Sequence, residues 1–512
     1  MMATYNLLFL LLTLEVCSAY KLLVVFPVPG KSHAILGEGY VRHLLAAGHE
    51  VTYITPVNNM KPSPNLRIVD VSDNFKLHSM GDVFNVKKII NKEVNIKDVH
   101  LVKNLFVDIA NTTVTHPNVR KLMEDPNERF DLVIVEWLYT EVMSGFSLVF
   151  DCPYIWSSSM DPHALVLSLI DGAPNPAYTA DVMSADHPPF TFWQRLEELW
   201  IYLKNIFTIW YVQIFSDAFA AVANKRGVEF APFEEIKFNG SLMLGNSHIS
   251  FGQPISTPQS YKPILGYHIP ETVAPLPQHI QKIMDNSPHG VIYFSMGSML
   301  KAESFPILLK QDLVRLFSGL RQTVLWKFEE NLPDLPKNMH IVNWAPQMSV
   351  LAHPNCILFI THGGLLSLTE AIHFAVPIIG VPAFADQFLN MDRVVRKGFG
   401  RVVNLNDDLA KNMKDAISFV LDDPRYRARA KEVSYVYHHR LSSPAAELVH
   451  WVEHVITTRG APHLRSLALS VPFYQKYYLD LVAVLLTVLG IVTNAAIFLL
   501  RKKKVDVIKK NK

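Results

Sequence analysis

The sequence predicts an α/β protein with two Rossmann-like, parallel-sheet domains that face each other across a cleft, followed by one membrane-spanning helix. An apolar strand at 21–26, a helical pattern at 32–47 and a second apolar strand at 51–54 are the opening of a parallel sheet, which binds ligands beyond the carboxyl ends of its strands. The alternation of strands and helices restarts at 290–294. The apolar run 479–500 is long enough to cross a bilayer.

Both ends of the chain carry targeting information. A short apolar core at 7–14 predicts a signal peptide at 1–19, because the core is too short to span a bilayer. Basic residues follow the apolar run directly, so the positive-inside tendency places the tail 501–512 in the cytosol and the body in a lumen. Lys509 and Lys510 resemble the dilysine signal of the endoplasmic reticulum, with a solvated stop-transfer tail as the alternative. These features predict a single-pass type I protein of the endoplasmic reticulum membrane.

Length and composition narrow the class of protein. A chain of 512 residues suits two ordinary domains with an anchor. The balance of 48 Lys and Arg against 46 Asp and Glu gives no case for a nucleic-acid partner, and the oligomeric state stays open, a homo-oligomer included. After the signal peptide only Cys152 and Cys356 remain, so we expect buried thiols and no disulfide framework. Sequons predict glycosylation at Asn111 and Asn239.

The elements of the first half lead to a proline-rich linker. Residues 20–250 form the predicted amino-terminal domain, with further strands at 131–135 and 154–156. The aromatic segment 192–221 is compatible with a buried helix or with a surface helix resting on the bilayer, and we favour the buried helix. Six prolines mark 251–277 as the linker.

The second half is predicted to contain the remaining elements in order. A carboxyl-terminal domain occupies 278–440, and helical patterns continue through 441–476. The membrane helix then occupies 477–500 and the basic tail 501–512.

The stretch 343–390 arranges several ligand-binding features along the chain. Trp344 offers an aromatic face, and a buried strand leads to the turn Thr361-His362-Gly363-Gly364 at the start of a helix. The free N–H groups of a helix amino terminus favour anions. A second buried strand ends near the polar pair Asp386-Gln387. This order suits a ligand with a flat base, a diphosphate and a sugar; an ordinary β-α-β unit with a core tryptophan is the alternative.

This set of residues resembles the signature of the UDP-glycosyltransferases, and the chain is similar to membrane-anchored animal members, the insect ones in particular. The segments 26–33 and 48–52 match the opening motif of the family. The resemblance implies the two-domain fold called GT-B, with the last helices bracing the amino-terminal domain. It also implies inverting transfer from a UDP-sugar without a metal or a further cofactor. Nothing in the sequence resembles the clustered carboxylates of a metal–diphosphate site.

The resemblance places the UDP-sugar in the carboxyl-terminal domain. The matching residues are Trp344 for uracil, Gln347 and Glu370 for the ribose, Ser298, His362, the Gly364 N–H and Ser367 for the diphosphate, and Asp386 and Gln387 for the hexose. Vertebrate members often carry Asn-Gly where Leu366-Ser367 stand, so Ser367 is expected to replace that asparagine. A structural cap is the alternative role for His362.

The donor sugar is expected to be glucose. A glucuronate donor needs a cation near its carboxylate, and the segment 266–277 offers only His268, with Glu271 nearby. The likeness to insect members also favours UDP-glucose.

His33 is the expected catalytic base. An alcohol acceptor is a poor nucleophile, so a positioned imidazole must take its proton, which is worth roughly 10²–10⁴-fold in rate. A helix cap is the alternative role, but the opening motif favours the base. A carboxylate on the other ring nitrogen fixes the tautomer. Family members commonly place Asp where this chain has Glu136, at the end of the strand 131–135, and we predict that Glu136 pairs with His33. Asp131 opens that strand and so faces the opposite edge.

The acceptor pocket is expected in the first domain. Phe84, the region 105–111, the segment 174–183 and the aromatic helix after Phe190 are expected to form apolar walls. Such a pocket suits small lipophilic alcohols and phenols, such as plant toxins, pigments and steroids.

Three functions are compatible with the sequence. The leading one is transfer of glucose from UDP-glucose to a lipophilic hydroxyl. The second is a catalytically weak UDP-sugar-binding membrane protein, suggested by Glu136 in place of the usual aspartate. The third, a nucleotide-sugar epimerase on a similar two-domain fold, is disfavoured by the lumenal anchor and by the His33 motif.

Overall fold

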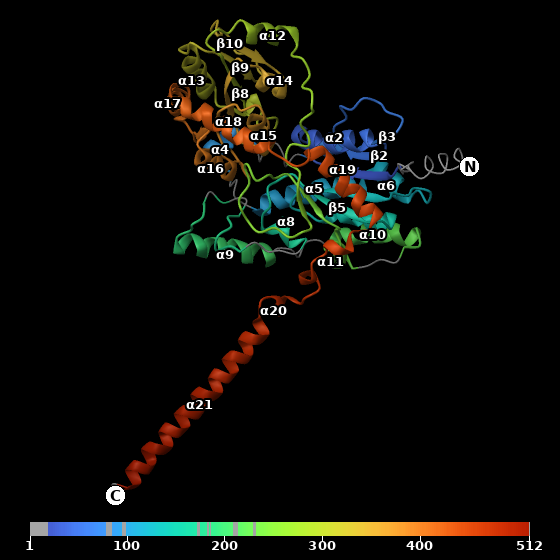
Figure 1. The fold of residues 1–512 in the computed structure, drawn as a ribbon, viewed down its shortest axis with the longest axis vertical. Coiled ribbons are helices and arrows are strands. Elements are labelled where there is room, and N and C mark those ends of the chain that lie inside the picture. The colour runs from blue at the N-terminus through green and yellow to red at the C-terminus, as the bar shows by residue number, and fades with distance from the viewer. Residues whose placement is uncertain are drawn as a thin grey trace, which may run out of the picture. The chain divides into compact units, whose positions relative to one another are not determined.

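The computed structural model describes residues 19–510, except 78–83, 95–98, 171–174, 182–183, 185, 208–212 and 229–231 (Figure 1). Almost all of the predicted signal peptide and the last two residues of the tail therefore lie outside the described part of the chain. The chain forms two compact units, 1–464 and 465–512, and each is considered by itself.

The first sheet has seven parallel strands in the order β3-β2-β1-β4-β5-β6-β7. The strands are β1 (Lys21–Val25), β2 (Glu50–Thr55), β3 (Leu66–Asp70), β4 (Leu132–Trp137), β5 (Tyr154–Ser158), β6 (Met243–Gly245) and β7 (Tyr261–Pro263). β4 is buried along its whole length, as expected for a parallel strand covered on both faces. The strand β7 lies inside the predicted linker 251–277. Pro263 is tolerated there because an edge strand does not need every backbone N–H for pairing.

The second sheet has six parallel strands in the order β10-β9-β8-β11-β12-β13. The strands are β8 (Val291–Ser295), β9 (Thr323–Lys327), β10 (Met339–Val342), β11 (Cys356–Thr361), β12 (Ile378–Gly380) and β13 (Gly400–Val402). Two parallel sheets joined in one unit confirm the predicted GT-B arrangement.

Helices connect the strands of each sheet. Those of the first unit are α2 (Lys31–Ala46), α4 (Val86–Ile90), α5 (Val99–Thr115), α6 (Pro117–Glu124), α7 (Gly145–Phe150), α8 (Ala164–Ser168), α9 (Phe192–Phe207), α10 (Gln213–Lys225), α11 (Phe233–Ile236), α12 (Gln278–Asp285), α13 (Ile307–Ser318), α14 (Gln347–Ala352), α15 (Leu365–His373), α16 (Gln387–Lys397), α17 (Leu409–Asp422), α18 (Pro424–His438) and α19 (Pro444–Thr457). The second unit contains α20 (Phe473–Lys476) and α21 (Leu479–Lys510).

Helix α19 follows the second sheet in sequence but packs on the first. Its buried residues Leu448, Val452 and Val455 join one apolar cluster with Tyr40 and Leu44 of α2 (Figure 1). The carboxyl-terminal end of the body therefore completes the core of the amino-terminal half.

Helix α9 corrects the expectation of a buried helix for the first part of 192–221, whereas Phe219 of α10 is buried. Phe192, Trp193, Leu196, Leu199 and Trp200 are all exposed, Trp193 at 73 % and Trp200 at 67 %. The apolar positions recur at helical spacing and form one stripe, and this stripe faces away from the core. The helical period alone cannot tell an inward stripe from an outward one.

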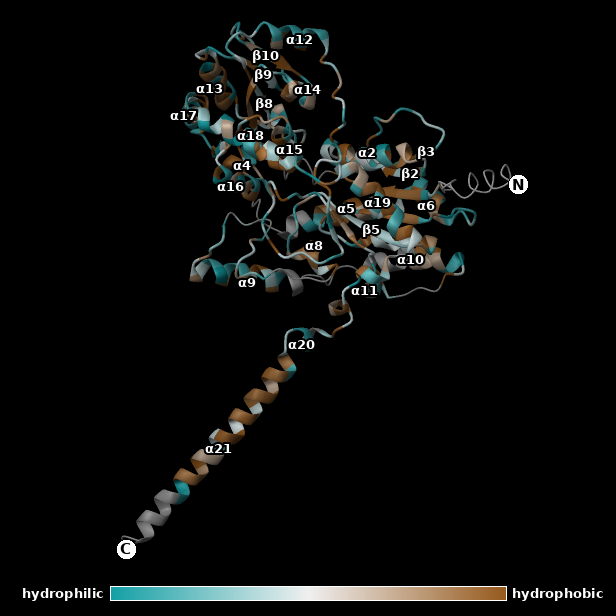
Figure 2. Cartoon of the chain, in the orientation of Figure 1, coloured by the Kyte–Doolittle hydropathy of each residue, from teal (hydrophilic) through white to brown (hydrophobic). Residues whose placement is uncertain are grey.

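The second unit consists mainly of α21. Its segment Leu479–Lys502 contains an 18-residue window with a mean hydropathy of 2.4 and is long enough to cross a membrane. Hydrophobic residues predominate along this segment, with a few polar residues between them (Figure 2). This helix contains the apolar run 479–500 and begins two residues after the start of the predicted membrane helix 477–500.

Candidate active site

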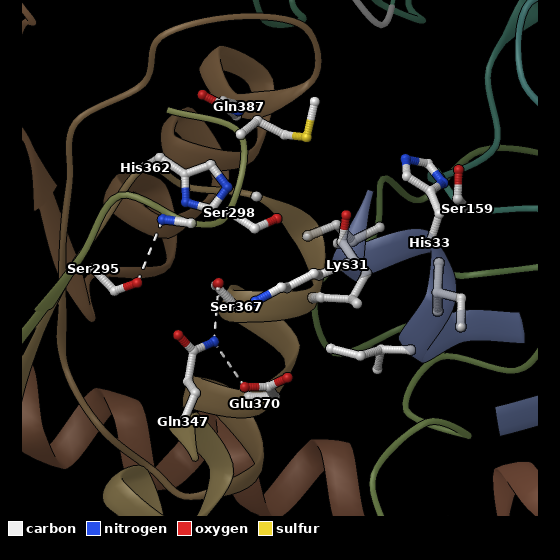
Figure 3. Close-up of a pocket in the computed structure, with 18 of the residues that line it drawn as sticks. Lys31, His33, Ser159, Ser295, Ser298, Gln347, His362, Ser367, Glu370 and Gln387 are labelled. Carbon is white, nitrogen blue, oxygen red and sulfur yellow. Dashed lines mark hydrogen bonds between the residues drawn. The ribbon is translucent and has the colours of Figure 1, made fainter. Parts of the chain in front are cut away.

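A cavity of about 460 Å³ lies between the two halves, at the carboxyl ends of strands from both sheets (Figure 3). Lys31 and His33 reach it from the first half, from the turn of helix that follows β1. Ser298 and His362 reach it from the loops after β8 and β11. Parallel strands thus deliver residues that are distant in sequence to one cavity.

His33 and Glu136 form a direct contact on the wall of the first half. Nδ1 of His33 lies 2.5 Å from Oε1 of Glu136. β1 and β4 are neighbouring strands, so the helix after β1 and the end of β4 lie side by side. The Glu136 side chain is 1 % exposed. The structure thus brings these two predicted residues together, whereas Asp131 is exposed and accepts a hydrogen bond from the Lys21 N–H at 2.7 Å.

The surroundings of His33 favour its protonated form. Burial lowers the pKa of the imidazole, but the charge of Glu136 and the hydrogen bond to it act in the other direction. Asp386, across the cavity, also raises the pKa, and the net shift is upward. An imidazole in this setting holds a proton more tightly than a free histidine does.

Asp386 and Gln387 occupy the amino terminus of α16. Asn390 donates to Oδ2 of Asp386 at 2.8 Å and to the carbonyl of Gly363 at 3.2 Å, which ties the carboxylate to the turn after β11. Burial is the main cause of the raised pKa of Asp386. Oε1 of Gln387 accepts from the Ala383 N–H at 2.8 Å, so its amide nitrogen is the end left to meet a ligand.

Two glycines make room for the ring of His362. A Cβ on Gly297 would lie 2.7 Å from Cε1 of His362, and a Cβ on Gly364 would lie 2.6 Å from Nε2. Gly297 also has φ +77°, which other residues rarely adopt. Burial and the charge of Lys327 lower the pKa of His362 to about 4. His362 is therefore neutral at pH 7 and can donate a hydrogen bond without adding charge.

The amino terminus of α15 is open to an anion. Gly364 occupies the cap position in an extended conformation and has no capping side chain. The first N–H groups of this helix therefore point toward the cavity without a cap, next to His362 and Ser367.

Three residues predicted near the ribose and diphosphate form one network. Nε2 of Gln347 donates to Oε2 of Glu370 at 2.8 Å and to Oγ of Ser367 at 3.1 Å (Figure 3). Oε1 of Glu370 lies 3.6 Å from Nε2 of the buried His268. Gln347 thus holds the carboxylate by a hydrogen bond from one side, and the His268 ring lies on the other side without a hydrogen bond to it.

Two lysines, neither of which was singled out from the sequence, lie close to the ring of Trp344. The side chain of Trp344 is 48 % exposed. Nζ of Lys31 lies 3.7 Å from the centroid of its ring, and Nζ of Lys327 lies 5.8 Å away. Lys327 also donates to the carbonyl of Gly297 at 2.9 Å and bonds Glu329. In the sequence, Lys327 stands out only as a charged residue at the end of a buried strand.

A buried ion pair joins the two halves near Asp386. Nη2 of Arg393, on α16, lies 2.9 Å from Oδ2 of Asp161 in the first half, and both side chains are less than 10 % exposed. Burial raises the pKa of Asp161 and Arg393 opposes that rise. No sequence signal pointed to this pair, because its members lie in different domains.

The other predicted residues lie away from the cavity. Asn111 and Asn239, the sequon asparagines, are exposed. Cys356 is buried and Cys152 is partly buried, and both are free thiols. Among the residues that the structure describes, no group of three or more His, Cys, Asp or Glu side chains could hold a metal ion.

Comparisons with known proteins agree along nearly the whole chain. The family model described as "UDP-glucoronosyl and UDP-glucosyl transferase" matches residues 21–512. UDP-glucosyltransferase 2 of Dactylopius coccus is 32 % identical, over 91 % of this chain and 90 % of that protein. UDP-glucuronosyltransferase 2B15 of Rattus norvegicus is 27 % identical, over 89 % and 88 %.

Solved structures share the fold. A UDP-glucosyltransferase from Polygonum tinctorium, in complex with 3,4-dichloroaniline, superposes with a TM-score of 0.55 at 14 % identity, covering 86 % of this chain and 99 % of that one. The glycosyltransferase VinC in complex with DTDP has a TM-score of 0.55 at 17 % identity, covering 85 % and 100 %.

Proposed function

The chain belongs to the UDP-glucuronosyl and UDP-glucosyl transferase family and is a UDP-glycosyltransferase, and we propose that it transfers glucose from UDP-glucose to the hydroxyl of a small lipophilic acceptor. The transfer inverts the anomeric carbon. The contact of the buried Glu136 with His33, which lines the cavity opposite the donor residues, is the observation that carries this proposal.

His33 acts as the general base. Oε1 of Glu136 accepts a hydrogen bond from the Nδ1–H of His33, which leaves Nε2 as the basic nitrogen. The acceptor oxygen attacks the anomeric carbon and its proton passes to Nε2 of His33. The bond from that carbon to the diphosphate oxygen breaks, and UDP leaves with the electron pair. Glu136 stabilises the imidazolium that forms.

The donor lies along the second half from base to sugar. Trp344 stacks on uracil, and Gln347 and Glu370 bind the ribose. Ser298, Ser367, the neutral His362 and the N–H groups at Gly364 bind the diphosphate, and Asp386 and Gln387 bind the hexose. The network between Gln347, Ser367 and Glu370 supports this order. Hydrogen bonds to the leaving diphosphate stabilise its developing charge.

The charges of the cavity favour glucose over glucuronate. Of the described residues that line it, Lys31 and Lys327 are the only lysines or arginines, and both lie at Trp344, the base end. The sugar end carries the carboxyl of Asp386 and the amide of Gln387. The carboxylate of a glucuronate would meet Asp386 there, and the nearby guanidinium of Arg393 is already paired with Asp161.

Apolar walls in the first half suit a flat, lipophilic acceptor. Phe106 and Tyr139 stack at 5.8 Å with an angle of 13° between their rings, and Leu105 and Val28 line the same cavity. The segment 174–183, predicted to contribute, lies partly outside the described residues. Phenols and steroids have this shape and polarity, which suggests a role in detoxification.

We place the enzyme in the endoplasmic reticulum membrane as a single-pass type I protein with a lumenal body. The apolar helix α21 can anchor it, and the exposed sequons at Asn111 and Asn239 are available for glycosylation.

The test is glycoside formation by the full chain in detergent micelles, measured by mass spectrometry with a panel of phenols and steroids. UDP-glucose should be used and UDP-glucuronate should not, and the product should be the β-anomer. His33→Ala should abolish transfer and still bind UDP, whereas His450→Ala, an exposed histidine on α19, should keep activity. UDP binding without any transfer would instead identify a UDP-sugar-binding protein.

A further inference from the structure

The face of Trp344 is covered by a side chain from the opposite half. Lys31 is the first residue of α2, two positions before His33, and its Nζ lies 3.7 Å from the centroid of the Trp344 ring. The side chain crosses the cavity from α2 toward the side that carries Ser298 and Ser367 (Figure 3). A cation held at this distance lies where the plane of a stacked base would lie.

Lys31 lacks polar contacts of the kind that hold Lys327 in place. Lys327 is buried and is anchored by the carbonyl of Gly297 and by Glu329. Lys31 is exposed, and among the described side chains its one short-range partner is the indole of Trp344. Burial, Lys327 and Lys301 lower the pKa of Lys31, and the more distant Glu329 opposes them. A cation in this position is poorly compensated, and only its contact with the indole must break for it to turn toward another partner.

We propose that Lys31, a residue of the acceptor-binding half, takes part in recognising the donor. In the empty site its ammonium lies on the ring of Trp344. When the base of the donor stacks on that ring, the ammonium is displaced and binds the diphosphate. This inference rests on the proposed function, because it takes Trp344 as the platform for uracil. One ring face cannot hold an ammonium and a base together, so the two compete. The diphosphate at Ser298 and His362 provides the negative charge that the displaced ammonium lacks.

Lys31 therefore has opposite effects on the two parts of the donor. It opposes stacking of the base, since its own contact with Trp344 must be broken. It favours the diphosphate through a charge-assisted hydrogen bond. A nucleoside without phosphate meets only the opposing effect, and so Lys31 makes the site select UDP and UDP-sugars over uridine. Because Lys31 belongs to the same turn of α2 as His33, this contact also links donor binding to the position of the base.

The test compares the affinities of UDP and uridine by isothermal titration calorimetry on the full chain in detergent. Lys31→Ala should weaken UDP about tenfold, the effect of one charge-assisted contact, and should leave uridine unchanged or bound more tightly. The preference for UDP over uridine should therefore fall at least about tenfold. Lys31→Arg should preserve the preference. Lys301→Ala, which removes a nearby exposed lysine outside the cavity, is the matched control and should keep it within about threefold.

The outcomes separate the two proposals. A wild-type chain that binds no UDP would overturn the proposed function together with this inference. Binding and glucose transfer by the wild type, with an unchanged preference in Lys31→Ala, would overturn the role of Lys31 alone. Equal weakening of UDP and uridine would also overturn it, because a purely structural role of Lys31 predicts that result.

Discussion

Replacing Glu136 by glutamine removes the negative charge beside His33 and keeps the length of the side chain. The amide oxygen can still accept from Nδ1, so the tautomer is preserved, but the imidazolium formed during transfer loses its counter-charge. At a separation of about 4 Å and an effective dielectric constant of about 20, that attraction is worth at most ~4 kcal/mol. Since about 1.36 kcal/mol is tenfold in rate, we expect kcat to fall about 10²- to 10³-fold.

The pH dependence of transfer by Glu136→Gln shows whether the contact between His33 and Glu136 serves catalysis or only structure. The charge of Glu136 raises the pKa of His33 against the effect of burial, which lowers it. The base must be neutral, so kcat/KM of the wild type rises with pH through this raised pKa. In Glu136→Gln, which lacks this charge, kcat/KM should rise at a lower pH than in the wild type and should reach a lower plateau.

The assay is glucoside formation from pH 5 to 9, with the affinity for UDP as the control, expected within about twofold of wild type. Oε2 of Glu136 has no hydrogen-bond partner within the described part of the chain. The new amide group is therefore left unpaired, and this should cost about 1–3 kcal/mol of stability, visible as a lower Tm. Glu136→Asp keeps the charge and should lose less activity. A plateau within about threefold of wild type, or a rise that moves to higher pH, would refute the pairing as the basis of catalysis.

Three further predictions concern the donor site and the joint between the halves. Gly297→Ala should weaken UDP binding at least about tenfold in calorimetry, because its Cβ would lie 2.7 Å from the ring of His362; unchanged affinity would contradict that packing. His362 is neutral above a pKa of about 4, so His362→Gln should keep much of the UDP affinity that His362→Ala loses, and equal losses would argue against a hydrogen-bonding role. Asp161→Asn leaves the buried Arg393 without a counter-charge and should lower the free energy of unfolding by about 3–5 kcal/mol in urea denaturation, whereas Asp392→Asn, in a more exposed pair, should cost about 1 kcal/mol or less.

The parts of the site set by strand order were accessible from the sequence. Glu136 ends a strand and His33 follows one, and carboxyl ends of neighbouring parallel strands meet at one edge of a sheet. Their contact was therefore predictable, although their catalytic roles stay predictions. Gln347 and Glu370 were placed near the ribose only by the family resemblance, and the hydrogen bond between them was not predicted.

The contacts that depend on how the two halves face each other could not be predicted from the sequence. Lys31 lies on Trp344, and Arg393 pairs with Asp161, only because the two domains are apposed in one particular way. Periodicity within either domain says nothing about that apposition. The sequence left a buried and a surface helix open for α9 and could not decide between them, since an apolar stripe has the same period whether it faces the core or not.

The position of α19 has a consequence for how the protein is made. Leu448 and Val452 close the core around α2, yet the ribosome delivers them only after the whole second half. Until α19 has been synthesised and packs, the amino-terminal half exposes apolar surface, and such a state is prone to aggregation. A polypeptide cut at the linker should therefore be insoluble, and the two halves should not fold as separable pieces.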